Sequence, residues 1–292
     1  MPVEETVPAG IRAVPVRRSG GRLENDFVVV EQPLEIRVDG RPVVVTMRTP
    51  GHDEELAAGF LYAEGIIAGG GAIASVQAVA GEAGGGGQAD GTRLADFAGD
   101  RVEVTLAAGA AAAAAASGVP EPAAGRAFAA TAACGVCGKE SIEDLERLNQ
   151  GLPVVAPGGA APAPIEQLEA LPDRLRAAQA LFDATGGIHA AGIFTPEGER
   201  LCVREDVGRH NAVDKVIGHF VLRDAVPLHD RILVVSGRAG FELVQKALRA
   251  AIPTMVSVGA ASSLAVEMAA GAGMTLYSFA GRGRGNLHVA VR

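Results

Sequence analysis

The chain has 292 residues, a length that suits one large domain or two ordinary ones. It carries 26 basic and 34 acidic residues, and the formal charge of −8 disfavours nucleic acid as a partner bound through bulk charge. Its 3 cysteines are too few for a disulfide framework and indicate a reducing compartment. The N-terminus lacks the basic and apolar regions of a signal peptide, and outside one alanine tract no uncharged apolar stretch is long enough to span a membrane. We therefore expect a cytoplasmic protein without a membrane segment.

The first third of the chain predicts a small mixed α+β unit. Residues 1–25 combine Pro, Gly and Arg and are expected to form a flexible arm. Apolar and polar residues alternate over 34–48 around Asp39-Gly40, which predicts a β-hairpin. A helix is expected over 53–64, where acidic residues in the first turn suit the helix dipole. Residues 101–106 alternate again and predict a strand.

Three stretches of low complexity interrupt the pattern. Residues 81–91 are glycine-rich and residues 107–116 alanine-rich, and both are interpreted as connectors without chemistry. Residues 151–164 hold four prolines and three glycines, which indicates a linker between domains. We therefore predict four parts: a flexible arm (1–25), an N-terminal α+β domain (26–150), a linker (151–164) and a C-terminal α/β domain (165–292).

The C-terminal part alternates between strand and helix patterns. Leucines from Leu168 to Leu181 recur at helical spacing. Beyond them, strands are expected at 188–195, 200–204, 231–236, 254–258 and 275–279, and helices at 211–221, 241–251 and 262–270. Such alternation predicts a layered α/β domain with a largely parallel sheet.

The sharpest chemical feature is the pair Cys134 and Cys137. Each cysteine precedes a glycine, and Lys139 and a helix expected after Ser141 would favour a thiolate through their positive charge. The pair alone leaves three interpretations open: inert thiols, part of a zinc site, or redox or sulfur-transfer chemistry. Cys202 lies between two apolar residues of a strand pattern, and we expect it to be a small buried side chain.

Polar turns follow the predicted strands of the C-terminal part. A charged segment, 204–215, contains His210, and glycines combine with hydroxyl or basic residues at 236–240, 259–263 and 279–286. Ligands of open α/β sheets bind at the carboxyl ends of the strands, and helix N-termini attract anions. Together, these turns predict a ligand that carries phosphate.

Four segments of the chain resemble the FdhD/NarQ family of formate dehydrogenase accessory proteins: 133–141, 185–191, 204–215 and 236–246. The likeness runs in the same order from about residue 26 to residue 288. It implies a sulfurtransferase that accepts sulfur from a cysteine desulfurase as a cysteine persulfide. The sulfur would then pass to the molybdenum cofactor before that cofactor enters formate dehydrogenase.

The resemblance also assigns residues. Cys134 would carry the persulfide, and Cys137 would be its partner. The cofactor, as bis(molybdopterin guanine dinucleotide), would bind at Phe279, Ala280, Gly281, Arg282, Gly283 and Arg284, with no permanently bound metal. The C-terminal domain would resemble the cytidine deaminase fold as an α/β/α layered unit, and the chain would form a homodimer.

Two alternatives follow from the same residues. A zinc deaminase is rejected, because the His-x-Glu or Cys-x-Glu element expected before Pro-Cys-x-x-Cys is missing and alanine precedes Cys134. A zinc-binding or nucleotide-binding scaffold without sulfur transfer remains the alternative function. Gly281 and Gly285 stand where relatives often carry larger residues, which weakens the expected hold on the ligand.

Overall fold

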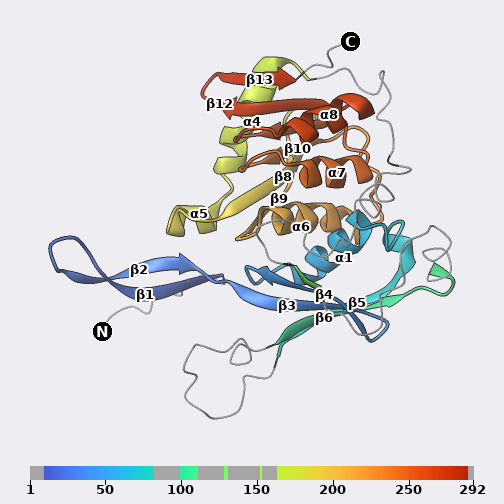
Figure 1. Ribbon diagram of the computed structural model, residues 1–292, viewed down its shortest axis with the longest axis horizontal. Helices are drawn as coiled ribbons and strands as arrows, with labels where there is room; N and C mark the ends of the chain where they lie inside the picture. Colours follow the sequence, from blue (N-terminus) through green and yellow to red (C-terminus); the bar gives the residue numbers. More distant parts are fainter. Residues whose placement is uncertain (1–9, 82–98, 111–127, 131–151, 153–162, 289–292) are drawn as a thin grey trace.

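A computed structural model of the chain describes residues 10–81, 99–110, 128–130, 152 and 163–288. These residues form a two-stranded hairpin, a five-stranded sheet and a six-stranded sheet (Figure 1). None of the helices in these ranges is long and apolar enough to cross a membrane. The combination of helices with these sheets confirms the predicted mixed α/β class.

The first hairpin occupies much of the region predicted as an arm. Strands β1 (Ile11–Arg17) and β2 (Leu23–Val29) pair antiparallel and project from the body of the molecule (Figure 1). The hairpin turns at Gly20 and Gly21, whose φ values of 105° and 84° only glycine adopts readily, so this part of the chain is a β-hairpin where an arm without secondary structure was expected. A tight turn at this point lets the flanking β-branched residues pair as strands.

The five-stranded sheet contains the predicted Asp39-Gly40 hairpin. Its order is β5-β6-β3-β4-β7. The strands are β3 (Gln32–Val38), β4 (Arg41–Arg48), β5 (Ile73–Val79), β6 (Asp100–Leu106) and β7 (Phe128–Ala130). Helix α1 (Asp53–Ala63) follows β4 as predicted, and a short 3-10 turn, η1 (Gly70–Ala72), precedes β5.

The six-stranded sheet has the order β13-β12-β11-β10-β8-β9. Its strands are β8 (His189–Phe194), β9 (Arg200–Asp206), β10 (Ile232–Val235), β11 (Thr254–Ser257), β12 (Thr275–Gly281) and β13 (Arg284–His288). Strands β9, β10, β11 and β12 point in one direction and β8 and β13 in the other. Only the β10–β11 and β11–β12 pairings are parallel, so the sheet is mixed and not largely parallel as predicted. Short hairpins join β8 to β9 and β12 to β13, and a hairpin reverses the direction of the chain.

Helices cover both faces of this sheet. They are α4 (Ile165–Arg176), α5 (Ala180–Thr185), α6 (Arg209–Val221), α7 (Phe241–Arg249) and α8 (Ser263–Ala272). Strand β10 shows the division, because Ile232 and Val234 pack with α4 while Leu233 and Val235 pack with α6, α7 and α8. Alternate residues of a strand face opposite sides, so a fully apolar strand is buried on both faces.

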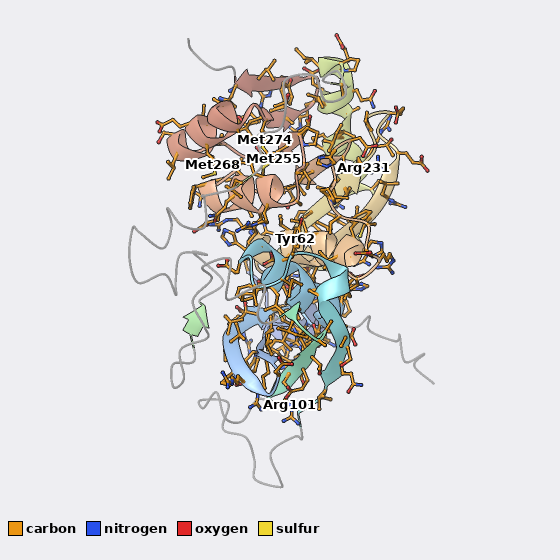
Figure 2. The ribbon with its side chains drawn as sticks, turned by 90° about the vertical axis from the view of Figure 1, so that its right-hand side faces the viewer. Tyr62, Arg101, Arg231, Met255, Met268 and Met274 are labelled. Atoms are coloured by element: carbon orange, nitrogen blue, oxygen red, sulfur yellow. The ribbon has the colours of Figure 1, made fainter. Side chains whose placement is uncertain are left out.

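The two larger sheets share one hydrophobic core. Helix α1 packs against α6, and the apolar residues of the five-stranded sheet join those of α6 and α7 in a single cluster. Tyr62 lies at this junction (Figure 2), and its hydroxyl donates to the Arg249 carbonyl over 3.1 Å. The predicted domain boundaries stay a prediction, because most of the 151–164 linker lies outside the described residues.

Two glycines allow α1 and α6 to cross closely. A Cβ atom added to Gly59 would lie 1.9 Å from the Asp214 carbonyl oxygen. One added to Gly218 would lie 1.8 Å from the Glu55 carbonyl oxygen. The backbones of the two helices therefore touch where any side chain would hold them apart.

Candidate functional site

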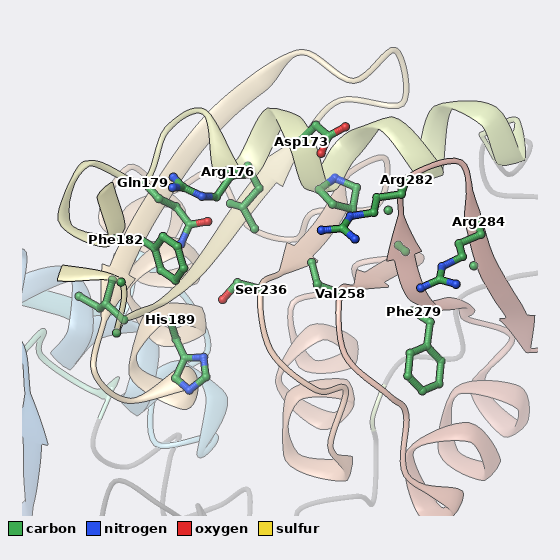
Figure 3. Close-up of a pocket in the computed structure, with 18 of the residues that line it drawn as sticks. Asp173, Arg176, Gln179, Phe182, His189, Ser236, Val258, Phe279, Arg282 and Arg284 are labelled. Atoms are coloured by element: carbon green, nitrogen blue, oxygen red, sulfur yellow. The ribbon is translucent and has the colours of Figure 1, made fainter. Parts of the chain in front are cut away.

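A cavity of about 990 Å³ lies at one edge of the six-stranded sheet (Figure 3). Ser236, Val258 and Phe279 line it at or just beyond the carboxyl ends of β10, β11 and β12. His189, at the start of the antiparallel β8, lines the same edge. Ligand sites of α/β proteins form at such strand ends, and their volumes reach about 1,000 Å³.

The predicted cofactor stretch 279–284 forms one wall of this cavity. Its residues that line the cavity are Phe279, Ala280, Gly281, Arg282 and Arg284. Gly283 belongs to the turn between β12 and β13 and is not among the lining residues. Five of the six predicted residues thus line one cavity, and their role in binding the cofactor stays a prediction.

The backbone of this wall is strained. Phe279 and Arg282 have φ values of 54° and 55°, which L-residues seldom adopt. The pairing of β12 with β13 shifts register between Ser278 and Gly281, and the Phe279 amide donates to the Gly259 carbonyl over 3.1 Å. Strained residues held by surrounding structure cluster at ligand sites. Phe279 itself is 52% exposed and lines the cavity.

Gly285 has a structural role next to this wall. A Cβ atom at Gly285 would lie 2.3 Å from the ring of Tyr277. The glycine therefore makes room for a buried aromatic side chain, whose hydroxyl donates to Glu169 over 2.9 Å. Burial and this hydrogen bond raise the pKa of Tyr277 to about 12.

The opposite wall comes from the end of α4 and from α5. Its side chains include Asp173, Arg176, Gln179 and Phe182 (Figure 3). Arg176 stacks 4.5 Å above the ring of Phe182 and pairs with Asp183 over 2.6 Å. This arrangement occupies its guanidinium within the wall.

Glu205 of β9 holds this wall in place. Its two carboxylate oxygens accept hydrogen bonds from the backbone amides of Leu181 and Phe182, both over 2.9 Å. These amides lie in the first turn of α5 and have no partner inside the helix. Burial raises the pKa of the Glu205 carboxyl. A residue of the sheet edge thereby fixes the position of Gln179 and Phe182 beside the cavity.

His189 and Ser236 form the floor between the walls. The Ser236 hydroxyl accepts a hydrogen bond from the Ala190 amide over 2.9 Å. Burial lowers the pKa of His189, and the positive charges of Arg209 and His210 lower it further. The imidazole is therefore neutral at neutral pH. The floor offers polar atoms without net charge.

The other predicted turns serve mainly the fold. Gly259 donates its amide to the Gly237 carbonyl over 2.9 Å, so these two turns pack backbone against backbone. The Ser262 hydroxyl caps α8 by accepting from the Ala265 amide over 3.3 Å. The turns thus lie at the expected sheet edge, but within the described structure only Ser236 of the 236–240 and 259–263 turns lines the cavity, beside Val258 at the end of β11.

The charged segment 204–215 joins the two sheets. Arg204 donates to both carboxylate oxygens of Glu55 over 2.6 and 2.9 Å. Lys215, buried inside, reaches the Asp206 carboxylate over 2.7 Å and the Thr49 carbonyl over 2.8 Å. These contacts bind α1 and the residues just before it to β9 and α6. The sequence pattern suggests a ligand-binding turn here, but in the structure these charges pair with Glu55 of α1 and with one another, and of the segment's residues only Val207 lines the cavity.

The cysteines divide into two groups. Cys202 is buried, as predicted, and burial raises its pKa to about 11, so it stays a thiol at neutral pH. Cys134 and Cys137 lie outside the described residues, and their roles stay predictions. Within the described ranges, no three His, Cys, Asp or Glu side chains are placed to hold a metal ion.

No local sequence pattern marks the α4–α5 wall of the cavity. The leucine spacing predicted helix α4 but not that its end lies over the strand ends. Glycine and hydroxyl residues are typical of a ligand-binding loop, whereas glutamine and phenylalanine, the residue types at 179 and 182, also occur in helices that bind nothing. Only the packing of α4 across the sheet, through Leu168, Leu171 and Leu175, brings them to the cavity.

Comparisons with known proteins identify the relatives of this chain. It is 46% identical over 255 residues to the sulfur carrier protein FdhD of Mycobacterium tuberculosis, which covers 87% of this chain and 86% of that protein. It is 42% identical over 268 residues to the protein of the same name from Streptomyces coelicolor, covering 92% and 89%.

A solved structure has the same fold. The crystal structure of a putative formate dehydrogenase accessory protein from Desulfotalea psychrophila matches with a TM-score of 0.65 at 24% identity, over 96% of both chains. The sequence model of the FdhD/NarQ family matches residues 29–290. With this match and these identities over most of its length, the chain belongs to the FdhD/NarQ family.

Proposed function

We propose that this protein is a sulfur carrier and sulfurtransferase in the maturation of formate dehydrogenase. It would accept sulfur from a cysteine desulfurase on Cys134 and deliver it to the molybdenum cofactor before the cofactor enters formate dehydrogenase. The names of the relatives at 42% and 46% identity support the carrier role. The observation that carries the proposal is the cavity beside Arg282 and Arg284, because it provides a place for the sulfur acceptor.

The loading step requires a thiolate. The Cys134 sulfur attacks the outer sulfur of the donor's cysteine persulfide, the donor's S–S bond breaks, and the donor cysteine leaves as a thiolate. No oxidant or reductant is consumed, because one persulfide replaces another. Cys202 cannot perform this attack, since it is a buried thiol with a raised pKa.

Release needs two electrons, and Cys137 can supply them. Attack of its thiolate on the Cys134 sulfur releases the outer sulfur as hydrosulfide and leaves a disulfide between the two cysteines. A dithiol reductant then restores both thiols. This step explains why the sequence carries a pair where loading alone needs one cysteine.

The cofactor is a substrate here, and the cavity suits one guanine dinucleotide end of it. Within the described structure, the guanidinium groups of Arg282 and Arg284 have no hydrogen-bond or ion-pair partner. Guanidinium groups bind phosphate with two parallel hydrogen bonds. We propose that this wall holds the pyrophosphate and that the strained Phe279 presents its ring to the ligand.

Membership of the FdhD/NarQ family supports the remaining proposals. The protein would act in the cytoplasm as a homodimer, without a permanently bound metal. Its C-terminal part would share the cytidine deaminase fold, an idea that the helices on both faces of the six-stranded sheet support.

Mass spectrometry of the intact protein tests the loading step. After incubation with a cysteine desulfurase and cysteine, the wild type should gain the mass of one sulfur atom, and Cys134→Ala should gain none. Cys202→Ala is the matched control and should load as the wild type does. Loading of Cys134→Ala would refute the assignment. One zinc ion per purified chain, with loss of stability on chelation, would favour a zinc-binding scaffold.

A further inference from the structure

The cavity contains one polar group that the fold leaves without a partner. Gln179, between α4 and α5, is only 3% exposed, and its side-chain Nε2 has no hydrogen-bond partner in the described structure. The residue lines the cavity, and Figure 3 shows its amide on the wall opposite Arg282. A buried donor without a partner costs stability, so such a group in a ligand cavity points to a ligand acceptor.

The backbone holds Gln179 in a fixed position. Its amide donates to the Arg176 carbonyl over 3.2 Å, and its own carbonyl accepts from Asp183 over 3.0 Å. The Leu181 and Phe182 amides donate to the Glu205 carboxylate. The side chain is therefore set beside the cavity before any ligand arrives, which lowers the entropic cost of binding.

Charge differs between the two ends of the cavity. Arg282 and Arg284 lie at one end, whereas Gln179, Phe182 and His189 lie at the other (Figure 3). Of the side chains that line the second end, Arg176 is paired with Asp183 and burial lowers the pKa of His189, so this end carries less unpaired positive charge than the first. A ligand with an anionic part and an uncharged part would therefore bind in one orientation.

We propose that Gln179 is a specificity-determining residue that donates its Nε2 hydrogen to the ring carbonyl of a guanine base, while Arg282 and Arg284 hold the phosphates. This inference rests on the proposed function, which supplies the guanine nucleotide as ligand. Guanine has a carbonyl acceptor where adenine has an amino donor. A hydrogen-bond donor at the end of the cavity away from the arginines therefore selects guanine. A site built to donate a hydrogen bond to the guanine carbonyl rejects adenine, which has no carbonyl at that position.

The test replaces the donor by an acceptor of the same shape. Gln179→Glu should weaken binding of guanosine diphosphate and inosine diphosphate at least tenfold in calorimetry, since both bases carry the carbonyl. It should not weaken adenosine diphosphate, whose amino group can donate to the carboxylate. Binding of inorganic pyrophosphate, which reaches only the basic end, should stay within twofold of the wild type. Gln77→Glu, on the exposed face of β5, is the matched control.

A second variant tests the cost of the unpartnered donor. Gln179→Leu removes the buried amide, so the ligand-free protein should unfold at the same temperature or about 2 °C higher. The same variant should lose guanosine diphosphate affinity at least tenfold. A stable variant that binds less ligand excludes misfolding as the cause.

The outcomes separate this inference from the proposed function. Wild type that binds guanosine diphosphate, with Gln179→Glu binding it equally well, would overturn the role of Gln179 alone. Equal weakening of pyrophosphate would also overturn it, because Gln179 would then contact phosphate. If the wild type binds no guanosine diphosphate, the proposed cofactor site is wrong and this inference falls with it.

Discussion

Replacement of Gly59 by alanine tests the close crossing of α1 and α6. The new Cβ atom would lie 1.9 Å from the Asp214 carbonyl oxygen, whereas real Cβ atoms essentially never come within 3.0 Å of such an atom. The two backbones would have to separate by about 1.1 Å. Because the obstacle is backbone on a packed helix, no side-chain rotation relieves the clash.

The expected loss of stability follows from this separation. Overpacking of a core costs about 1–3 kcal/mol, and the higher helix propensity of alanine returns about 1 kcal/mol at most. Separation also stretches the bonds of 2.6 and 2.9 Å between Arg204 and Glu55, which lies one turn before Gly59. We expect a net loss of about 1–2 kcal/mol in the free energy of unfolding, measured by urea denaturation followed by circular dichroism.

Gly271 provides the matched control. It also lies in a helix, α8, but a Cβ atom there would meet nothing within 4 Å. Gly271→Ala should therefore leave stability unchanged or raise it by up to about 1 kcal/mol. The reasoning is refuted if Gly59→Ala unfolds within about 0.5 kcal/mol of the wild type, which is the range of an ordinary surface substitution.

Two further predictions concern the ligand wall and the charge cluster between the sheets. Arg284→Glu should weaken guanosine diphosphate binding by roughly 2 kcal/mol or more in calorimetry, because a cation is replaced by an anion, while persulfide loading on Cys134 continues. Arg200→Glu, at the far end of β9, should bind as the wild type does, and equal binding by both variants would place the phosphates elsewhere. Hydrogen bonds from Arg204 and His219 outweigh burial and hold the pKa of Glu55 below its model-peptide value of 4.5. Because this pKa is lowered on folding, ionised Glu55 contributes its full stabilisation above pH 4.5. The contribution is lost as the pH falls through the pKa that Glu55 has in the folded protein. Glu55→Gln should therefore show a shallower loss of unfolding free energy below pH 4.5 than the wild type, and parallel pH profiles would contradict the coupling.

Local patterns predicted most of the elements. The Asp39-Gly40 turn formed because both residues adopt positive φ, and helix α1 begins with the three acidic residues that marked it in the sequence. Strand directions were harder to predict, because alternation of helices and strands is compatible with several topologies. The hairpin at 195–199 reverses the chain after β8 and makes the sheet mixed.

Only one wall of the candidate site could be predicted from the sequence. The stretch 279–284 has the composition of a ligand loop, and it lines the cavity. Gln179 and Phe182 reach the same cavity through tertiary packing and through the Glu205 carboxylate of a distant strand. Contacts of this kind depend on the arrangement of α4 over the sheet, which no local pattern encodes.

The bonds between the two sheets also constrain the order of folding. Thr49 and Lys215 are separated by 166 residues along the chain, and Glu55 and Arg204 by 149. During synthesis, helix α1 therefore emerges long before its partner α6 exists. The apolar side of α1 cannot be buried until α6 has been synthesised. Contacts between residues so distant in sequence form slowly, and the hydrophobic surface stays exposed until they form. A chaperone that binds exposed apolar surface would therefore act mainly on the N-terminal part of the chain, before α6 has been synthesised.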